Sequence, residues 1–437
     1  MRRARRVYVA VERDVAPSRA ARESNMVGIT LACDTIKHRM VPIHISKGRQ
    51  MIYDVPTLGQ EEEAAVASID KLRRDLRYYV AEPRRWVGSV RRVLSARAIQ
   101  GSNSIEGYNV SVEDAIAAIE GEEPVEAAQV DRQAVQGYQR AMTYVLQLAD
   151  DEYFEYSSAL IRSLHFMMTE YALGASPGRW RPGPIWVRNN TTGEVVYEAP
   201  DNAAVPGLVD ELIGQLSSNG DVPAMVRGAM AHLNLVMIHP FRDGNGRMSR
   251  CLQTLALSRE RILAPELSSI EEYLGRNTDS YYRILAEVGQ GSWNPQGDAR
   301  KWVRYCLRAH YVQAISVLRR IRESETMWLE VEALANAHRL PDRAMAALLD
   351  AAIGLRIRNA AYRSVLRHGW QEEISNQVAT NDLRHMVNAG LLEQRGTKRG
   401  TYYVGSPVLR EIREEVRRSR APIDTTRLFV PELQSAG

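Results

Sequence analysis

Apolar residues recur every three or four positions through most of the middle of the chain. This spacing occurs in 125–148 and 155–173, neither of which contains proline, and again in 203–217 and 224–238. Each stretch predicts an amphipathic helix with one apolar face turned toward a core. A further helix is predicted to begin at Glu61–Glu63, because negative charge is favourable at a helix N-terminus. The region is therefore expected to be mainly α-helical.

Two short β-prone runs interrupt this helical pattern. Ile185–Val187 and Val195–Tyr197 lie on either side of a turn rich in Asn, Thr and Gly. Prolines separate both runs from the neighbouring helices, so the runs belong to one local unit. Two such runs around a turn predict a β-hairpin, here over 184–197.

Beyond residue 298 the pattern predicts one long charged helix, 299–338, that acts as a connector. After further helices come a strand at Leu391–Gln394, a turn that contains glycine and a second strand at Thr401–Val404. This order resembles a winged helix, with 380–389 in the position of the recognition helix and Lys398-Arg399 on the wing. We therefore expect a mainly α fold with a winged-helix-like domain near its C-terminal end.

The local charge balance does not decide whether this C-terminal domain binds DNA or another protein. Residues 341–420 hold 14 Lys and Arg against nine Asp and Glu, an excess of five positive charges. Within 371–404, however, four basic residues face four acidic ones. DNA contact through Arg384 and the wing is one interpretation, because basic side chains pair with phosphates. A protein-docking or dimerising module that merely shares the fold is the other, so a homodimer also stays open.

Composition excludes several classes of protein. The chain is 45% hydrophobic and 25% charged, as ordinary globular proteins are, and its net charge of +4 is too small to indicate a nucleic-acid binder. Cys33, Cys251 and Cys306 lack CxxC spacing, which argues against a disulfide framework or a zinc site. The start lacks a secretion signal, and no run approaches the roughly 20 apolar residues of a membrane helix. We expect a cytoplasmic protein without membrane contact.

The twelve residues from His239 to Arg250, HPFRDGNGRMSR, carry the most chemical information. Pro240 ends the preceding helix, because the residue before a proline is disfavoured in the helical region, so His239 stands at the mouth of a loop. Gly244 and Gly246 permit a tight path in which successive N–H groups converge on an anion. A new helix follows, and its N-terminus favours a phosphate at the same place.

Three charged side chains of the same segment suit a bound nucleotide. Arg247 and Arg250 lie three residues apart, share one face of the helix and can each grip phosphate oxygens. Asp243 offers one hard oxygen ligand, which suits Mg²⁺ shared between a carboxylate and phosphates. Alone, each residue has an ordinary structural interpretation, as a capping histidine, a turn or a solvated helix face. Their combination predicts a phosphate-binding catalytic loop.

The segment matches the Fic family signature HPFx(D/E)GN(G/K)RxxR at every fixed position, and the resemblance covers about 90–300. It implies a helical Fic core with a hairpin flap. It also implies an enzyme in which His239 takes a proton from a Ser, Thr or Tyr hydroxyl of a target protein while that oxygen attacks the α-phosphate of ATP. Asp243 would hold Mg²⁺. Doc-like members, which phosphorylate, tend to have Lys where this chain has Gly246, so AMP transfer is favoured.

The resemblance also implies a set of ATP contacts. We assign them to the remaining motif residues and, for adenine, to two residues downstream: Phe241, Gly244, Asn245, Gly246, Arg247, Arg250, Arg276 and Asn277. Other Fic chemistry stays open, namely phosphorylation, transfer of another nucleotide or removal of AMP. So does a DNA-binding regulator that uses its Fic domain as a sensor.

An upstream segment from Ser102 to Gly107, SNSIEG, has two interpretations. By itself it is typical of a helix end with a glycine stop. It also resembles the inhibitory motif (S/T)xxxE(G/N) of Fic proteins with an N-terminal inhibitory helix. That resemblance implies that Glu106 pairs with Arg250 and occupies the place of the ATP γ-phosphate, so that the isolated protein is autoinhibited.

The predicted organisation has three parts. Residues 1–75 form a leader that contains β-prone runs such as Val7–Val9, 76–300 form the Fic domain with its inhibitory helix, and 301–437 hold the connector helix and the winged-helix-like domain. In Fic proteins the hairpin flap lies over the active site and target segments align along it. The resemblance therefore implies docking of the target protein along 184–197, although a surface hairpin without such a role is the alternative.

Overall fold

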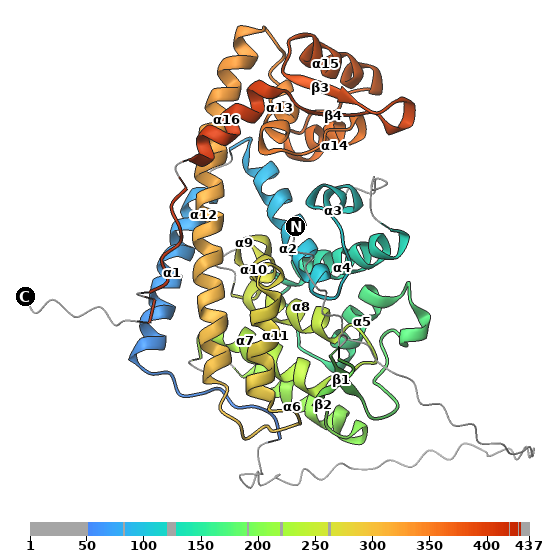
Figure 1. Ribbon diagram of the computed structural model, residues 1–437, viewed down its shortest axis with the longest axis vertical. Helices are drawn as coiled ribbons and strands as arrows, with labels where there is room; N and C mark the ends of the chain where they lie inside the picture. Colours follow the sequence, from blue (N-terminus) through green and yellow to red (C-terminus); the bar gives the residue numbers. More distant parts are fainter. Residues whose placement is uncertain are drawn as a thin grey trace, which may run out of the picture.

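The computed structural model describes a mainly helical protein with two small antiparallel sheets (Figure 1). The predicted leader run Val7–Val9 and Cys33 lie outside the described residues, whereas Cys251 and Cys306 are buried free thiols. Among the described helices, none is both apolar enough and long enough to cross a bilayer. The description covers residues 51–81, 84–119, 128–189, 192–218, 222–260, 264–418, 420–426 and 428–429.

Two helices joined by the motif loop form the centre of the molecule. α7 (Ala224–Ile238) and α8 (Asn245–Ser258) lie against each other, and nearly every side chain of both is buried. A helix that is apolar around most of its circumference belongs inside a core, and α7 is such a helix. α8 is buried although it also carries polar side chains, including Arg247 and Arg250. The helices around them are α2 (Val87–Ile105), α3 (Val112–Ile119), α4 (Gln129–Leu148), α5 (Ser158–Thr169), α6 (Val205–Ser217), α9 (Pro265–Ser268), α10 (Glu271–Arg276) and α11 (Thr278–Gly289).

The elements predicted from periodicity in this region are confirmed. The predicted helix 224–238 coincides with α7, and the predicted hairpin consists of β1 (Trp186–Arg188) and β2 (Val195–Glu198). In the hairpin, Val187 pairs with Tyr197, and a register shift follows at the end of β1. Prolines on both flanks keep these strands apart from the helices, as the sequence indicated.

One long helix runs along the molecule (Figure 1). α12 (Arg300–Ala337) packs against α7 and α11 in its first half and against the C-terminal helices in its second. The Nε1–H of buried Trp302 donates to the carbonyl oxygen of Ala229 at 2.7 Å, which fixes α12 to α7. α1 (Gln60–Ala81) lies along the other side of α12, with its acidic first turn paired to arginines of α12. The predicted connector is therefore a helix of the core as well.

The C-terminal part has the predicted order of helices and strands. The sheet of this part, β3 with β4, is antiparallel, and Ile357 forms an isolated antiparallel bridge with Tyr403. Three helices followed by a hairpin is the order that the sequence analysis compared with a winged helix, and α15 covers most of the segment 380–389 assigned there to the recognition helix. The elements are α13 (Ala344–Ile353), α14 (Asn359–Gly369), α15 (Asn376–Asn388), β3 (Leu392–Arg395), β4 (Tyr402–Gly405) and α16 (Pro407–Arg418).

Two glycines bring α2 and α10 into backbone contact. A Cβ atom at Gly101 would lie 2.6 Å from the carbonyl oxygen of Glu271, and one at Gly275 would lie 2.6 Å from the Cα atom of Gly101. Real Cβ atoms do not approach other atoms so closely, so only glycine permits this crossing. The contact matters for the site because Glu106 follows the last residue of α2.

We expect Gly101→Ala to lower the free energy of unfolding by about 1–3 kcal/mol, the usual range for overpacking. The matched control is Gly214→Ala in the middle of α6, where the added methyl group meets nothing within 4 Å. That control is expected to stabilise the protein by about 0.5–1 kcal/mol, because alanine is the better helix former. Denaturant unfolding measures both. An equal change in the two variants would contradict a close α2–α10 contact.

Candidate active site

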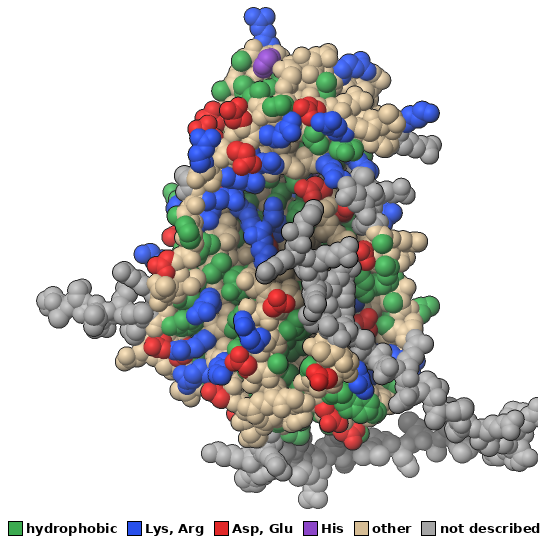
Figure 2. All heavy atoms as spheres, in the orientation of Figure 1, with side chains coloured by type: hydrophobic (Ala, Val, Ile, Leu, Met, Phe, Trp, Pro, Cys, Tyr) green, Lys and Arg blue, Asp and Glu red, His purple; other side chains and the backbone are tan. Residues whose placement is uncertain are grey.

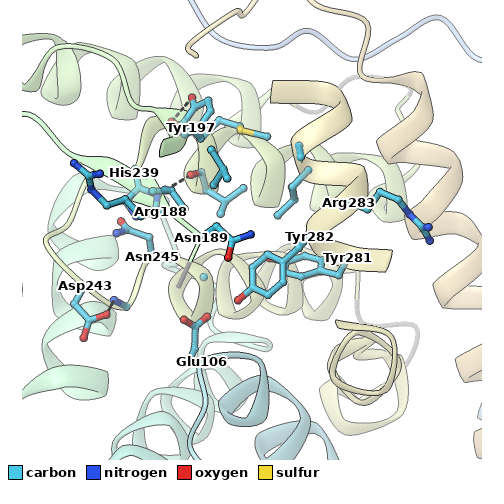
Figure 3. Close-up of a pocket in the computed structure, with 18 of the residues that line it drawn as sticks. Glu106, Arg188, Asn189, Tyr197, His239, Asp243, Asn245, Tyr281, Tyr282 and Arg283 are labelled. Atoms are coloured by element: carbon cyan, nitrogen blue, oxygen red, sulfur yellow. Dashed lines mark hydrogen bonds between the residues drawn. The ribbon is translucent and has the colours of Figure 1, made fainter. Parts of the chain in front are cut away.

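A cavity of about 390 Å³ opens where α7, α8, α11 and the hairpin meet (Figure 3). Glu106 points into it from the end of α2, His239 from the end of α7 and Asp243 from the motif loop. Val187 of β1 and Tyr282 of α11 also line it. Its volume lies within the usual range of small-molecule sites, about 300–1,000 Å³.

The imidazole of His239 is held in one orientation and one tautomer. His239 is the C-cap of α7 and adopts a left-handed backbone conformation with φ 51°. Its Nδ1 lies 3.0 Å from the carbonyl oxygen of Val236, which can only accept, so Nδ1 carries the proton and Nε2 keeps a free lone pair. Burial lowers the pKa of the ring below its usual 6.5, so the neutral form prevails at physiological pH. The ring is thus suited to accept a proton.

Arg181, which the sequence analysis missed, holds the end of α7 in place. Its backbone N–H and its Nε–H donate to the carbonyl oxygens of Pro240 and His239, each at 2.9 Å. Its two Nη groups donate to the carbonyl oxygens of Gly183, at 2.7 Å, and Pro200, which lie before and after the hairpin. One buried guanidinium therefore ties the base and both ends of the flap together. Its only sequence signal is its place just ahead of the hairpin.

The hairpin has a second anchor on the same helix end. The hydroxyl group of Tyr197 donates to the carbonyl oxygen of Met237 at 2.8 Å, and Tyr197 is buried. Some side chains of the hairpin remain open to solvent: Trp186 is 39% exposed and Val195 is 46% exposed. The flap is therefore fixed to α7 through Tyr197 and still presents apolar side chains to solvent.

Phe241 and Asn245 stabilise the conformation of the motif loop through hydrogen bonds to each other. The backbone N–H of Phe241 donates to Oδ1 of Asn245, and Nδ2 of Asn245 donates back to the carbonyl oxygen of Phe241, both at 2.9 Å. The ring of Phe241 is fully buried and stacks on His165 with centroids 3.7 Å apart. This differs from the nucleotide contact predicted for Phe241: its side chain is a packing element under the loop, and it does not line the cavity.

His165, which carried no signal in the sequence, supports the loop from below. Its Nε2–H donates to the carbonyl oxygen of Asp243 at 2.8 Å, and its Nδ1 accepts from the backbone N–H of Gly178 at 2.9 Å. Burial lowers the pKa of His165 to about 4, so the ring stays neutral and keeps this donor–acceptor arrangement. It fixes the backbone from which Asp243 projects.

The glycines and Asp243 of the loop leave room for an anion and a metal ion. Gly244 has φ 77°, which permits the turn into α8, and a Cβ atom at Gly246 would overlap the carboxylate of Glu106. The Asp243 side chain is 52% exposed and lines the cavity. No group of three or more His, Cys, Asp or Glu side chains is arranged for a metal ion anywhere in the described ranges. One accessible carboxylate fits Mg²⁺ that takes its other ligands from phosphates and water.

Arg250 and Glu106 form an ion pair at the wall of the cavity. Nη2 of Arg250 donates to Oε1 of Glu106 at 2.7 Å and to the carbonyl oxygen of Ser102 at 3.0 Å, and its Nε donates to Oγ of Ser102 at 2.8 Å. Its side chain is fully buried, and its Nη1 has no partner among the described residues. Glu106 lines the cavity whereas Arg250 does not, because the carboxylate covers the guanidinium. An orphaned buried donor of this kind fits a phosphate oxygen.

Arg247 occupies a different environment from Arg250. Its guanidinium lies 5.1 Å from the centre of the Tyr108 ring, and its Nη1 donates to the hydroxyl group of Tyr171 at 3.1 Å. The carboxylate of Asp243 lies 3.9 Å from its Nη2. The residue is buried and does not line the cavity. The structure thus brings only one of the two predicted arginines against Glu106.

The two residues predicted to contact adenine lie elsewhere. Arg276 ends α10, pairs with Glu272 at 2.7 Å and is 61% exposed, and Nδ2 of Asn277 donates to the carbonyl oxygen of Tyr273 at 2.8 Å. Neither residue lines the cavity. The helix break at Asn277 turns the chain, so α11 supplies the wall in their place. Its lining residues are Asp279, Tyr281, Tyr282, Arg283, Leu285 and Ala286.

A glycine stop fixes the position of Glu106. Gly107 has φ 86°, and its N–H donates to the carbonyl oxygen of Ser104 at 3.1 Å. The N–H of Tyr108 donates to the carbonyl oxygen of Asn103, also at 3.1 Å, which completes a Schellman end to α2. The helix end with a glycine stop is confirmed, and this cap directs Glu106 into the cavity.

Comparison with known proteins shows which family and relatives the chain is similar to. Residues 155–257 match the Fic/DOC family. Protein adenylyltransferase fic-1 of Caenorhabditis elegans is 27% identical over 204 residues, which are 46% of this chain and 37% of that protein. Protein adenylyltransferase Fic of Drosophila mojavensis is 25% identical over 262 residues, 59% of this chain and 47% of that protein. The matches thus span less than half of these relatives.

A solved structure extends the likeness in fold beyond the central domain. A Fic family protein from Desulfovibrio desulfuricans G20 has a TM-score of 0.51 and 23% sequence identity, over 81% of this chain and 98% of its own. That identity is low, so the likeness concerns the fold. The family match over 155–257, which contains the whole loop from His239 to Arg250, identifies this part of the chain as a domain of the Fic/DOC family.

Proposed function

We propose that this protein transfers AMP from ATP to a hydroxyl group of a Ser, Thr or Tyr residue on a target protein. The observation that carries the proposal is the position of His239. Its ring, with an unprotonated Nε2, lines the cavity. The glycine-rich N-terminus of α8 lines the same cavity. The names of the curated relatives, which are protein adenylyltransferases, support AMP as the transferred group.

The residues of the cavity suit a single in-line transfer. The target oxygen attacks the α-phosphorus of ATP, and its proton passes to Nε2 of His239. The bond between the α-phosphorus and the bridging oxygen breaks, and pyrophosphate leaves with that oxygen. The free N–H groups at the start of α8 stabilise the negative charge of the phosphates. When bound, Mg²⁺ supplies further charge neutralisation, and Asp243 is the side chain that would hold it.

Glu106 acts as a brake in this proposal. Its carboxylate accepts a hydrogen bond from Nη2 of Arg250 at 2.7 Å, where a phosphate oxygen would otherwise bind. Two anions cannot share that donor, since their charges repel. ATP therefore binds poorly, or in a pose that does not react, until Glu106 moves away.

The hairpin is the docking surface for the target in the same proposal. β1 and β2 form a two-stranded sheet, and an extended segment can add to a strand edge by main-chain hydrogen bonds without a fixed sequence. The exposed Trp186 and Val195 offer apolar contact beside that edge. A segment docked there lies next to the cavity that contains His239.

A second candidate function, DNA binding, is favoured by a groove in the C-terminal part. A cavity of about 670 Å³ between α14, α15 and the β3–β4 hairpin is lined by Arg358, Arg384 and Lys398 and by no carboxylate. The acidic residues of this region are engaged elsewhere: Glu393 pairs with two arginines outside the groove, and Asp382 pairs with Arg343. A sequence segment with no net charge therefore presents a basic groove, which suits a phosphate backbone.

We expect Glu106→Gly to raise AMP incorporation more than about tenfold over wild type, because a charge-assisted hydrogen bond of about 1.5–3 kcal/mol no longer competes with ATP. The assay is incubation with Mg²⁺ and ATP labelled at the α-phosphate, with auto-modification as the readout. Adding His239→Ala to this variant should lower the rate by about 10²–10⁴. Equal incorporation with and without Glu106 would rule out the brake. Transfer of label from γ-labelled ATP in a parallel reaction, with none from α-labelled ATP, would rule out AMP transfer.

The pH dependence of the Glu106→Gly variant tests the role of His239 separately. His239 acts as a base only when neutral, and burial lowers its pKa below 6.5, so transfer should persist at pH 6.5 and decline only at lower pH. Single-turnover rates between about pH 5 and pH 8 measure this. An acidic half-maximum at or above pH 6.5 would be inconsistent with a buried, neutral imidazole as the base.

For the second candidate, Arg384→Ala combined with Lys398→Ala should weaken binding of duplex DNA at least about tenfold. It should also reduce the slope of log K against log salt by about 1–2, since each lost phosphate contact contributes about one unit. Arg74→Ala with Arg77→Ala, two exposed arginines of α1, removes the same charge elsewhere and should change neither quantity. Equal losses in both pairs would show that overall charge, and not the groove, binds DNA.

A further inference from the structure

A second, strongly basic cavity lies where α2, α10, α12 and α16 meet, with a volume of about 240 Å³. Figure 2 shows Lys and Arg side chains gathered in a band over this part of the face. Five arginines from four helices and the turn after α16 line the cavity: Arg97, Arg276, Arg320, Arg417 and Arg420. No residue lines both this cavity and the one that contains His239.

The carboxylates around the cavity do not balance these arginines. Glu272 contacts Arg320 through both carboxylate oxygens at 2.6 Å, and it also contacts Arg276 at 2.7 Å and Arg97 at 3.7 Å. Glu323 pairs with Arg420. Five guanidinium groups therefore face two carboxylates, which leaves an excess of three positive charges.

Crowding of like charge affects the arginines themselves. Burial, with neighbouring arginines next in importance, lowers the pKa of Arg97 to about 10, well below the usual value for a guanidinium. The pKa of Arg417 is also lowered, first by burial and then by Arg420 and Arg413. Arg413 lies beside Glu414 at 3.7 Å, so that pair adds no net charge. An anion in the cavity would relieve this repulsion.

The shape and lining of the cavity narrow the class of ligand. Its remaining described walls are mainly aliphatic, namely Val90, Val93, Met327 and Ile353, and no aromatic side chain lines it. A base would therefore find no ring on which to stack. The guanidinium fork matches phosphate oxygens in bidentate fashion, and an excess of three charges suits two or three linked phosphates better than one.

We propose that this cavity is a second anion site, which binds a small ligand with two or three linked phosphate groups and no requirement for a base. The ligand would join four helices. One of them is α2, which leads to Glu106, and another is α10, which contacts α2 through Gly275 and Gly101. Because binding requires the folded arrangement of all four, it should also stabilise the protein.

Calorimetric titration of the full chain with inorganic tripolyphosphate and pyrophosphate tests the proposal. We expect Arg276→Gln with Arg417→Gln to weaken binding at least about tenfold, because two charge-assisted contacts are lost. Arg276 is 61% exposed, and Glu272 keeps Arg320, so folding should be retained. The matched control is Arg74→Gln with Arg77→Gln on α1, which should bind as wild type does. Orthophosphate should bind at least about tenfold more weakly than tripolyphosphate.

Thermal melting gives an independent readout. Tripolyphosphate should raise the melting temperature of wild type and of the α1 control but not of the Arg276/Arg417 variant. If that double variant does not melt cooperatively, Arg276→Glu alone reverses one exposed charge and should weaken binding by a similar factor. Equal affinity in wild type and both cavity variants would overturn the proposal. Tripolyphosphate binding that both cavity variants retain and that ATP displaces would locate the anion at the His239 cavity and overturn it as well. Neither result depends on AMP transfer, so failure here is distinct from failure of the proposed reaction.

Discussion

The buried guanidinium of Arg250 is the constraint on which the candidate site depends. A charge with no solvent exposure must be paired, and here Ser102 and Glu106 supply the acceptors from another helix. The pairing is incomplete, since Nη1 has no partner in the described structure. The same group that holds α2 in place is thus a group that a phosphate would use. In the proposed reaction, the carboxylate of Glu106 and a phosphate of ATP would compete for this shared donor.

That competition is meaningful only if α2 is placed accurately, and two features place it. The backbone contact of Gly101 with Gly275 sets the distance between α2 and α10. Glu272, buried on α10, then contacts arginines of both α2 and α12 and so fixes the direction of the crossing. The Schellman end after Glu106 determines where the carboxylate points. Separation of Glu106 from Arg250 therefore requires α2 to move as a unit or one side chain to rotate.

Local patterns in the sequence predicted those helices, helix ends and turns that depend on interactions between residues close together in the chain. Helical spacing and a proline predicted α7 and the place of His239 at the end of that helix, and turn residues predicted the hairpin. What was missed depends on contacts across the chain. His165 and Arg181 donate hydrogen bonds to backbone carbonyl groups 78 and 58 residues away. Every residue has such a carbonyl group, so the sequence does not show which one is used. Phe241 was assigned to the nucleotide because a motif shows which residues occur together, not which side of the loop each faces.

Arginine serves three purposes in this structure, and the available acceptors decide which. Arg181 is surrounded by carbonyl oxygens, which satisfy it without adding charge, so it only holds the backbone. Arg250 meets one carboxylate and keeps one free donor, so its environment can change when an anion arrives. In the cavity between α2, α10, α12 and α16, arginines outnumber carboxylates, so the pairing is incomplete by charge as well as by geometry. The number of acceptors around a buried cation, more than its position in a motif, separates a structural arginine from one that is ready to bind a ligand.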